Sequence, residues 1–150
     1  MLGDDLYIKL GRMTVEFGGL DFFVGLLAGH MAERLNESPV RVFTAQQLEQ
    51  IKEWAKSHAA ALGDDLVRDV SSFCGDAKGL LRRRHEGIHG LWLSDHPDEG
   101  QSFVLKLRAG DTMGYRSETT SETIVLLTAE ATAMANRASA LTVQFLKLFG

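Results

Sequence analysis

LYIKLGRMTVEFGGLDFFVGLLAGHM, residues 6–31, is the stretch that decides the fold. Its apolar side chains recur in alternating steps of four and three residues, the spacing of one face of an α-helix. These positions are Leu6, Leu10, Met13, Phe17, Leu20, Val24, Leu27 and Met31. Four of its glycines, Gly18, Gly19, Gly25 and Gly29, cost about 1 kcal/mol each relative to alanine, but small residues also let another helix approach closely. We therefore predict one long helix that ends at Asn36 to Pro39, because proline disfavours a helical conformation of the preceding residue.

A second helix is expected after the proline. Thr44 and Gln47 form a capping box, in which two side chains satisfy the free N–H groups at a helix start. An apolar stripe continues over residues 48–62, and Gly63 ends it.

Asp64 and Asp65 open a third helix, since acidic side chains are favourable at the positive end of the helix dipole. Its apolar seam consists of Leu66, Val70, Phe73, Ala77 and Leu80. The next position of this seam is occupied by Arg84.

The pattern changes between residues 91 and 116, where two short apolar runs, 91–93 and 103–107, flank the turn-rich segments SDHPDEG and AGDTMG. We expect a hairpin or an ordered loop there. A final helix is predicted from about Ser121, with Ser117 and Thr120 as alternative starts. Its seam positions are Ile124, Leu127, Ala131, Met134, Ala138, Leu141, Phe145 and Leu148. The sequence thus predicts a mainly α fold: a four-helix up-down bundle with two long helices and a small β-hairpin or loop insertion between the third and fourth.

Composition favours a single domain over residues 1–150 in a reducing compartment. The chain has 150 residues, 45% of them hydrophobic, which is enough for one core. Its only cysteine, Cys74, cannot form an intramolecular disulfide. The N-terminus carries acids where a secretory signal would carry bases, and no apolar run reaches membrane-spanning length. We therefore expect a cytoplasmic protein without a membrane segment.

The net charge of −4 restricts contact with nucleic acid to a local basic patch. The candidates are Lys78, Arg82, Arg83 and Arg84, which lead into the segment HEGIHGLW. This segment allows two interpretations.

The first interpretation is a zinc site, since HEGIH fits the pattern in which two histidines bind the metal and a glutamate polarises its water. His85 and His89 would be the ligands and Glu86 the base. The longer zinc-protease pattern requires other residues at Trp92 and Asp95. Candidate third ligands are Asp95, Asp98 and Glu118, none of them in a recognisable second motif.

The second interpretation starts from Arg84, whose guanidinium lies on an apolar seam. Burial of an unpaired charge is costly, so the position predicts a bound anion, a carboxylate or access to a solvated cleft. Alternatively, a fraying helix end lets the side chain extend to water. Arg82 and Arg83 lie off that face, as a solvated basic edge.

His89 lies five residues beyond Arg84, about 140° away on an ideal helix. The two side chains converge only if the helix ends or bends near Gly87 to Gly90. His85 and His89 share one face, and an imidazole transfers protons near neutral pH.

An arginine, a polar residue, three residues and a histidine, at the end of the third helix and followed by Gly-x-Trp, resemble the HEPN superfamily. The matching segment is Arg84-His85-Glu86-Gly87-Ile88-His89. The usual family form has asparagine in the second position, where this chain has histidine. The resemblance covers the whole chain as architecture, but only residues 84–92 as a motif.

This resemblance implies a homodimer and a metal-independent endoribonuclease without a cofactor, acting on an RNA substrate. By that analogy Arg84 binds the phosphate, His89 is the base or acid, and His85 orients or transfers a second proton. Arg82 and Arg83 would extend the RNA-binding edge, and Trp92 would stack on a base or pack in the core.

Three alternatives remain open. A non-catalytic HEPN-like module would serve dimerisation or bind nucleotides or partners, a zinc hydrolase would use HEGIH, and a helical adaptor would use its apolar seams. A role in defence or beside an antitoxin protein is an association of the family.

Overall fold

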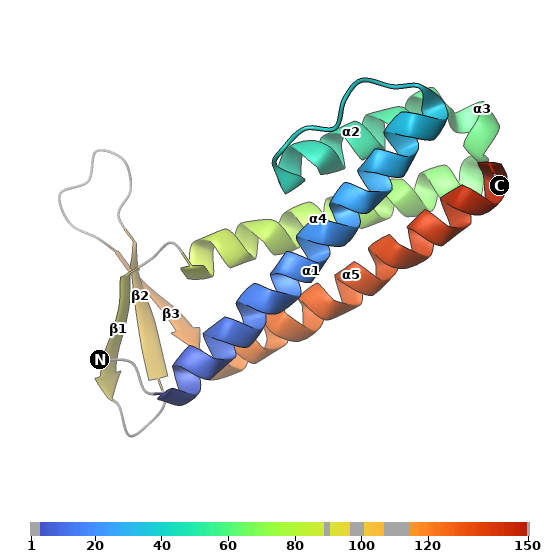
Figure 1. Ribbon diagram of the computed structural model, residues 1–150. Coiled ribbons are helices and arrows are strands. Elements are labelled where there is room, and N and C mark those ends of the chain that lie inside the picture. Colours follow the sequence, from blue (N-terminus) through green and yellow to red (C-terminus); the bar gives the residue numbers. More distant parts are fainter. Residues whose placement is uncertain (1–3, 89–90, 97–100, 107–114, 150) are drawn as a thin grey trace.

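The computed structural model describes residues 4–88, 91–96, 101–106 and 115–149, with side chains placed for 4–85 and 122–149. Five helices dominate the described chain and pack together (Figure 1). They are α1 (Asp4–Leu35), α2 (Thr44–Ser57), α3 (Ala59–Leu62), α4 (Asp64–Ile88) and α5 (Ser121–Phe149). The predicted mainly α character is therefore confirmed.

The long N-terminal helix follows its predicted seam. Seven of the eight seam residues are buried, and Leu10 packs partly buried against the same core. The role suggested for the four glycines is met at Gly25, where a Cβ atom would lie 3.6 Å from the Gln47 side chain of α2. At Gly18, Gly19 and Gly29 a Cβ atom would have nothing within 4 Å among the described residues.

The predicted second helix is interrupted at His58, which separates α2 from α3. The expected capping box is wrong. The residue before α2 is Phe43, and it makes no side-chain cap. The Thr44 hydroxyl donates to Asp21 Oδ1 (2.8 Å), and Gln47 Nε2 donates to the Arg41 carbonyl (2.8 Å). Contacts with other segments therefore replace the local motif.

The third predicted helix is confirmed as α4. It begins at Asp64, directly after Gly63, whose positive φ of 87° suits a residue without a side chain. All five residues of its apolar seam are buried. Arg84 follows on the same face, as the spacing predicts.

Contacts between helices show that α1, α2 and α5 run in one direction and α4 in the other. The start of α2 contacts the middle of α1 (Thr44 to Asp21), and His58, just after α2, contacts Glu37 beyond the end of α1. Helix α4 runs against α5, because its Asp76 and Arg83 pair with Arg137 and Glu130 in reverse order. It also runs against α2, because Lys78 contacts Glu49 while Arg84, further along α4, lies beside the start of α2. An up-down bundle requires successive helices to alternate in direction, and these helices do not (Figure 1).

The connection between α1 and α2 explains this departure. Residues 36–43 span up to about 26 Å when extended, more than the roughly 21 Å of helix between Asp21 and Leu35. The connection can therefore return along α1 before α2 begins. Gln50 of α2 holds it there, because its amide accepts from Arg41 N (2.9 Å) and donates to the Pro39 carbonyl (3.1 Å).

Between α4 and α5 the described backbone forms a three-stranded antiparallel sheet, β1 (Leu91–His96), β2 (Gln101–Lys106) and β3 (Tyr115–Thr120), in the order β1-β2-β3. The third strand leads directly into α5. The sheet lies at the end of the molecule where α1 and α5 begin and α4 ends (Figure 1).

By length and composition, α1 is apolar enough to cross a membrane, with a mean hydropathy of 1.2 over its most apolar window. The sequence prediction that no apolar run reaches membrane-spanning length therefore underestimated the length and apolar character of α1. Eight of its residues are buried in the core, and α1 packs against α2 and α5. Packing in the bundle accounts for the buried seam, whereas Ile8, Val15 and Phe22 of the same helix are exposed.

Candidate functional site

A groove of about 630 Å³ lies where the middle of α1, the start of α2 and the end of α4 meet. Its lining combines three cationic side chains, one histidine, one carboxylate and an apolar edge. The residues are Asp21, Val42, Phe43, Thr44, Ala45, Gln47, Lys78, Leu81, Arg82, Arg84 and His85. Three of the five predicted site residues, Arg82, Arg84 and His85, thus line one groove.

Arg84 is partly withdrawn from solvent, with 29% of its side chain exposed. Its guanidinium carbon lies 5.1 Å from the centre of the Phe17 ring, and its Nη1 lies 3.3 Å from Asp21 Oδ2. A cation over an aromatic face and beside a carboxylate is stabilised by both. Of the partners expected for this charge, a bound anion, a carboxylate or a solvated cleft, the structure shows a carboxylate at the edge of a groove.

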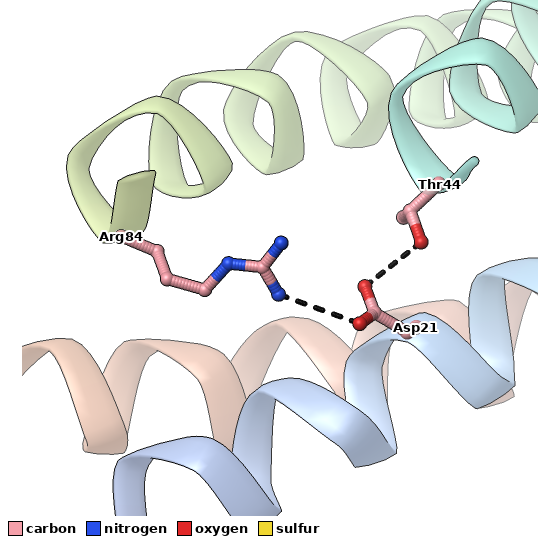
Figure 2. Close-up of polar contacts among 3 residues, drawn as sticks. All are labelled: Asp21, Thr44 and Arg84. Carbon is pink, nitrogen blue, oxygen red and sulfur yellow. Dashed lines mark hydrogen bonds and ion pairs between the residues drawn. The ribbon is translucent and has the colours of Figure 1, made fainter. Parts of the chain in front are cut away.

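Asp21 links three helices, as Figure 2 shows. One carboxylate oxygen accepts from Thr44 of α2, and the other from Arg84 of α4, while Asp21 itself belongs to α1. The side chain is 38% exposed, so the ion pair faces the solvated groove. Asp21 fixes where the Arg84 guanidinium lies.

Sequence reasoning missed Asp21, although a signal was present. It is the only Asp, Glu, Lys or Arg between residues 17 and 32. A lone acid in such an apolar stretch requires a partner. That partner lies 63 residues away, which periodicity alone does not reveal.

The basic cluster divides between two faces. Arg82 is exposed and lines the groove, whereas Arg83 pairs with Glu130 of α5 (2.7 Å) and does not line it. Lys78 also lines the groove and donates to Glu49 Oε1 (2.9 Å), a hydrogen bond that lowers the pKa of that exposed carboxyl. The structure therefore groups Arg82 with Arg84 and separates Arg83 from them.

The start of α2 adds a positive potential to the groove. Its first turn contains no acidic residue, and its N-cap residue, Phe43, supplies no side-chain acceptor. The first N–H groups of a helix lack partners within it and carry partial positive charge. Together with Lys78, Arg82 and Arg84, this helix end favours an anion such as a phosphate.

His89 lies outside the described residues, and no side chain is described for Glu86 or Trp92. Helix α4 ends at Ile88, within the range in which convergence of Arg84 and His89 requires it to end. Among the side chains described, 4–85 and 122–149, no three His, Cys, Asp or Glu side chains gather as a metal site would require. The zinc ligands considered above, except His85, lie beyond those side chains.

No protein-family model, curated protein or solved structure matches this chain. The case for a function therefore rests on the residues of the groove.

Proposed function

We propose that the chain is a metal-independent endoribonuclease of the HEPN type that cleaves single-stranded RNA. The observation that carries this proposal is the placement of Arg84. Its guanidinium lies at a groove with two other cations, held by Asp21 and above Phe17. A guanidinium fixed in this way suits a phosphodiester, whose charge increases in the transition state.

Arg84 keeps the capacity to bind a phosphate while paired with Asp21. A guanidinium has five N–H donors, and the Asp21 contact uses Nη1 alone (Figure 2). The remaining donors can contact two phosphate oxygens. Asp21 then positions the guanidinium while the phosphate approaches from the groove.

RNA supplies its own nucleophile in this reaction. An imidazole, assigned to His89, removes the proton of the 2′-OH, and the 2′-oxygen attacks the adjacent phosphorus. The bond from phosphorus to the 5′-oxygen breaks, and that oxygen takes a proton, with His85 as the orienting or second proton-transfer group. The products are a 2′,3′-cyclic phosphate and a 5′-hydroxyl, and no metal takes part.

A homodimer belongs to this proposal, and the outer face of α1 is the surface that supports it. This face exposes Ile8, Val15 and Phe22, the last with 63% exposed. Gly11 and Gly18 lie on the same face with open space beside them. An apolar face interspersed with glycines suits close packing of a second copy's helix.

We also propose that the chain belongs among HEPN-type four-helix bundles, with α3 continuing α2 and the sheet inserted before α5. A cytoplasmic location and control by an antitoxin or another partner protein complete the proposal. The buried reduced thiol of Cys74 agrees with a reducing compartment.

A non-catalytic module is the second candidate, and one observation favours it. The Arg84 charge is already paired within the chain, which is what a structural arginine needs. Such a module would bind a partner or nucleotide through the same groove without cleaving RNA.

The two candidates differ in one experiment. Untagged protein is incubated with mixed single-stranded RNA in EDTA. A His89→Ala variant whose helicity and oligomeric state are the same as those of the parent chain is incubated in parallel. The nuclease proposal expects cleavage by the parent chain and none by the variant. A parent chain that leaves RNA intact favours the binding module, and cleavage retained by the variant rules out the assigned mechanism.

A further inference from the structure

Two apolar side chains stand exposed at the edge of the groove. Val42 is 85% exposed and Phe43 is 69% exposed, and both line the groove beside Arg82 and Lys78. An aromatic ring in contact with water gains little for folding. We therefore ask what the exposed Phe43 ring, which lines the same groove as Arg82 and Lys78, could bind.

The backbone that carries the Phe43 ring is fixed. Phe43 has an extended conformation, with φ −89° and ψ 138°, and its carbonyl accepts from Gln47 N (2.9 Å). The preceding turn is tied to α2 through the Arg41 backbone, bonded to Gln50 and Gln47. Because the backbone is already fixed, only the rotation of the ring itself is ordered when a ligand stacks on it.

The neighbouring charges indicate what stacks there. Arg82 is exposed on the facing helix, α4, and the N–H groups at the start of α2 follow Phe43 directly. Single-stranded nucleic acid is bound by this combination, in which cations contact the backbone and an aromatic side chain stacks on a base. A buried apolar partner would instead place the exposed Arg82 charge beside an apolar surface, which is costly.

We propose that Phe43 is a base-stacking subsite for a nucleotide of single-stranded RNA adjacent to the one whose phosphate contacts Arg84. Arg82 and the start of α2 contact the phosphate between them. This inference rests on the proposed ribonuclease function and adds a base-binding subsite on the α2 side of the groove. Because every base has an aromatic face, the subsite requires a base without selecting its identity.

The test measures binding and not cleavage. A fluorescein-labelled single strand carries 2′-O-methyl groups throughout, so it lacks the nucleophile and stays intact. Fluorescence anisotropy compares the parent chain with Phe43→Ala, which should bind about tenfold more weakly, and Phe43→Trp, which should bind as the parent does. Phe149→Ala, at the C-terminal end of α5 and outside the lining of the groove, is the control and should leave binding unchanged.

Strands with one abasic position, moved along the sequence, identify the base that stacks. An abasic site in the Phe43 subsite should weaken binding by the parent about tenfold and have no further effect on Phe43→Ala. If the parent binds and Phe43→Ala binds equally well, the stacking subsite is wrong and the proposed function stands. If the parent binds no strand, both fail. A change of oligomeric mass in Phe43→Ala would assign the ring to a subunit contact and overturn the subsite.

Discussion

The contact between Asp21 and Arg84 predicts a measurable coupling in stability. Replacing Asp21 with Asn removes the negative charge but keeps a side-chain oxygen that accepts from Thr44. Replacing Arg84 with Met keeps an apolar stem beside Phe17 but removes the guanidinium. The Nη1–Oδ2 distance of 3.3 Å is longer than in the strongest charged hydrogen bonds, and both side chains are about one third exposed.

The expected coupling is therefore near the upper end for exposed ion pairs, about 1 kcal/mol. Asp21→Asn alone should lower the free energy of unfolding by about 1 kcal/mol. Asp21→Ala should lower it by about 2 kcal/mol, because it also removes the acceptor of the 2.8 Å bond from Thr44.

Urea unfolding followed by circular dichroism measures these values for the parent chain, both single variants and the double variant. The coupling should decrease at high salt, because the pair faces solvent. If the two single effects add within about 0.3 kcal/mol, Asp21 does not hold Arg84 and its positioning role fails.

Three further predictions concern the remainder of the fold. Phe73→Ala should lower the free energy of unfolding in urea by about 3–5 kcal/mol, because the Phe73 ring is fully buried. Val42→Ala, at an exposed position, should change it by less than about 0.5 kcal/mol. Equal effects of the two variants would contradict the described core. Gly63→Ala should destabilise by about 1 kcal/mol or more because φ is +87°, and an unchanged unfolding midpoint would contradict that conformation. Burial raises the pKa of the Cys74 thiol to about 12, so iodoacetamide at pH 8 should label the unfolded but not the native chain. Labelling of Cys74 in the native chain at pH 8 would contradict its burial. As the pH rises, the thiol of the unfolded chain loses its proton before the thiol of the native chain does. The contribution of Cys74 to the free energy of unfolding is therefore full below the ordinary thiol pKa and is lost toward pH 12.

The helices were predictable where the periodicity is local. The seams of α1 and α4 follow from spacing alone, since every turn of a helix repeats the same requirement for burial. Arg84 stood out for the same reason, as a charge in an apolar series. The need for an anion, a carboxylate or access to solvent followed from the cost of burying that charge.

Features that depend on distant residues were not predictable. The capping box at Thr44 and Gln47 failed because Asp21 and the Arg41 carbonyl compete for those side chains. The direction of α2 depends on Gln50, whose amide holds the connection back along α1. None of these hydrogen bonds produces a periodic pattern in the sequence.

The groove itself also lay beyond sequence reasoning. Phe43, just before α2, and Asp21 of α1 line one groove with Arg84 only because α2 begins beside the middle of α1. Only the lone charge of Asp21 within residues 17–32 pointed toward this arrangement.

Arg137 offers a matched control for the central claim. Like Arg84, it pairs with an aspartate, Asp76 (2.8 Å), and lies over a phenylalanine ring, Phe73 (5.7 Å). It does not line the groove. An arginine in a structural ion pair and the arginine proposed to bind the phosphate can therefore be compared within the same chain.

The most direct measurement is mass spectrometry of the products from single-stranded RNA in EDTA, for the parent chain, Arg84→Ala and Arg137→Ala. The proposed reaction predicts 2′,3′-cyclic phosphate ends from the parent and from Arg137→Ala. It predicts a loss of at least about a hundredfold in rate for Arg84→Ala, the magnitude typical of removing one transition-state donor. Intact RNA with the parent chain, or equal cleavage by Arg84→Ala and Arg137→Ala, would contradict it.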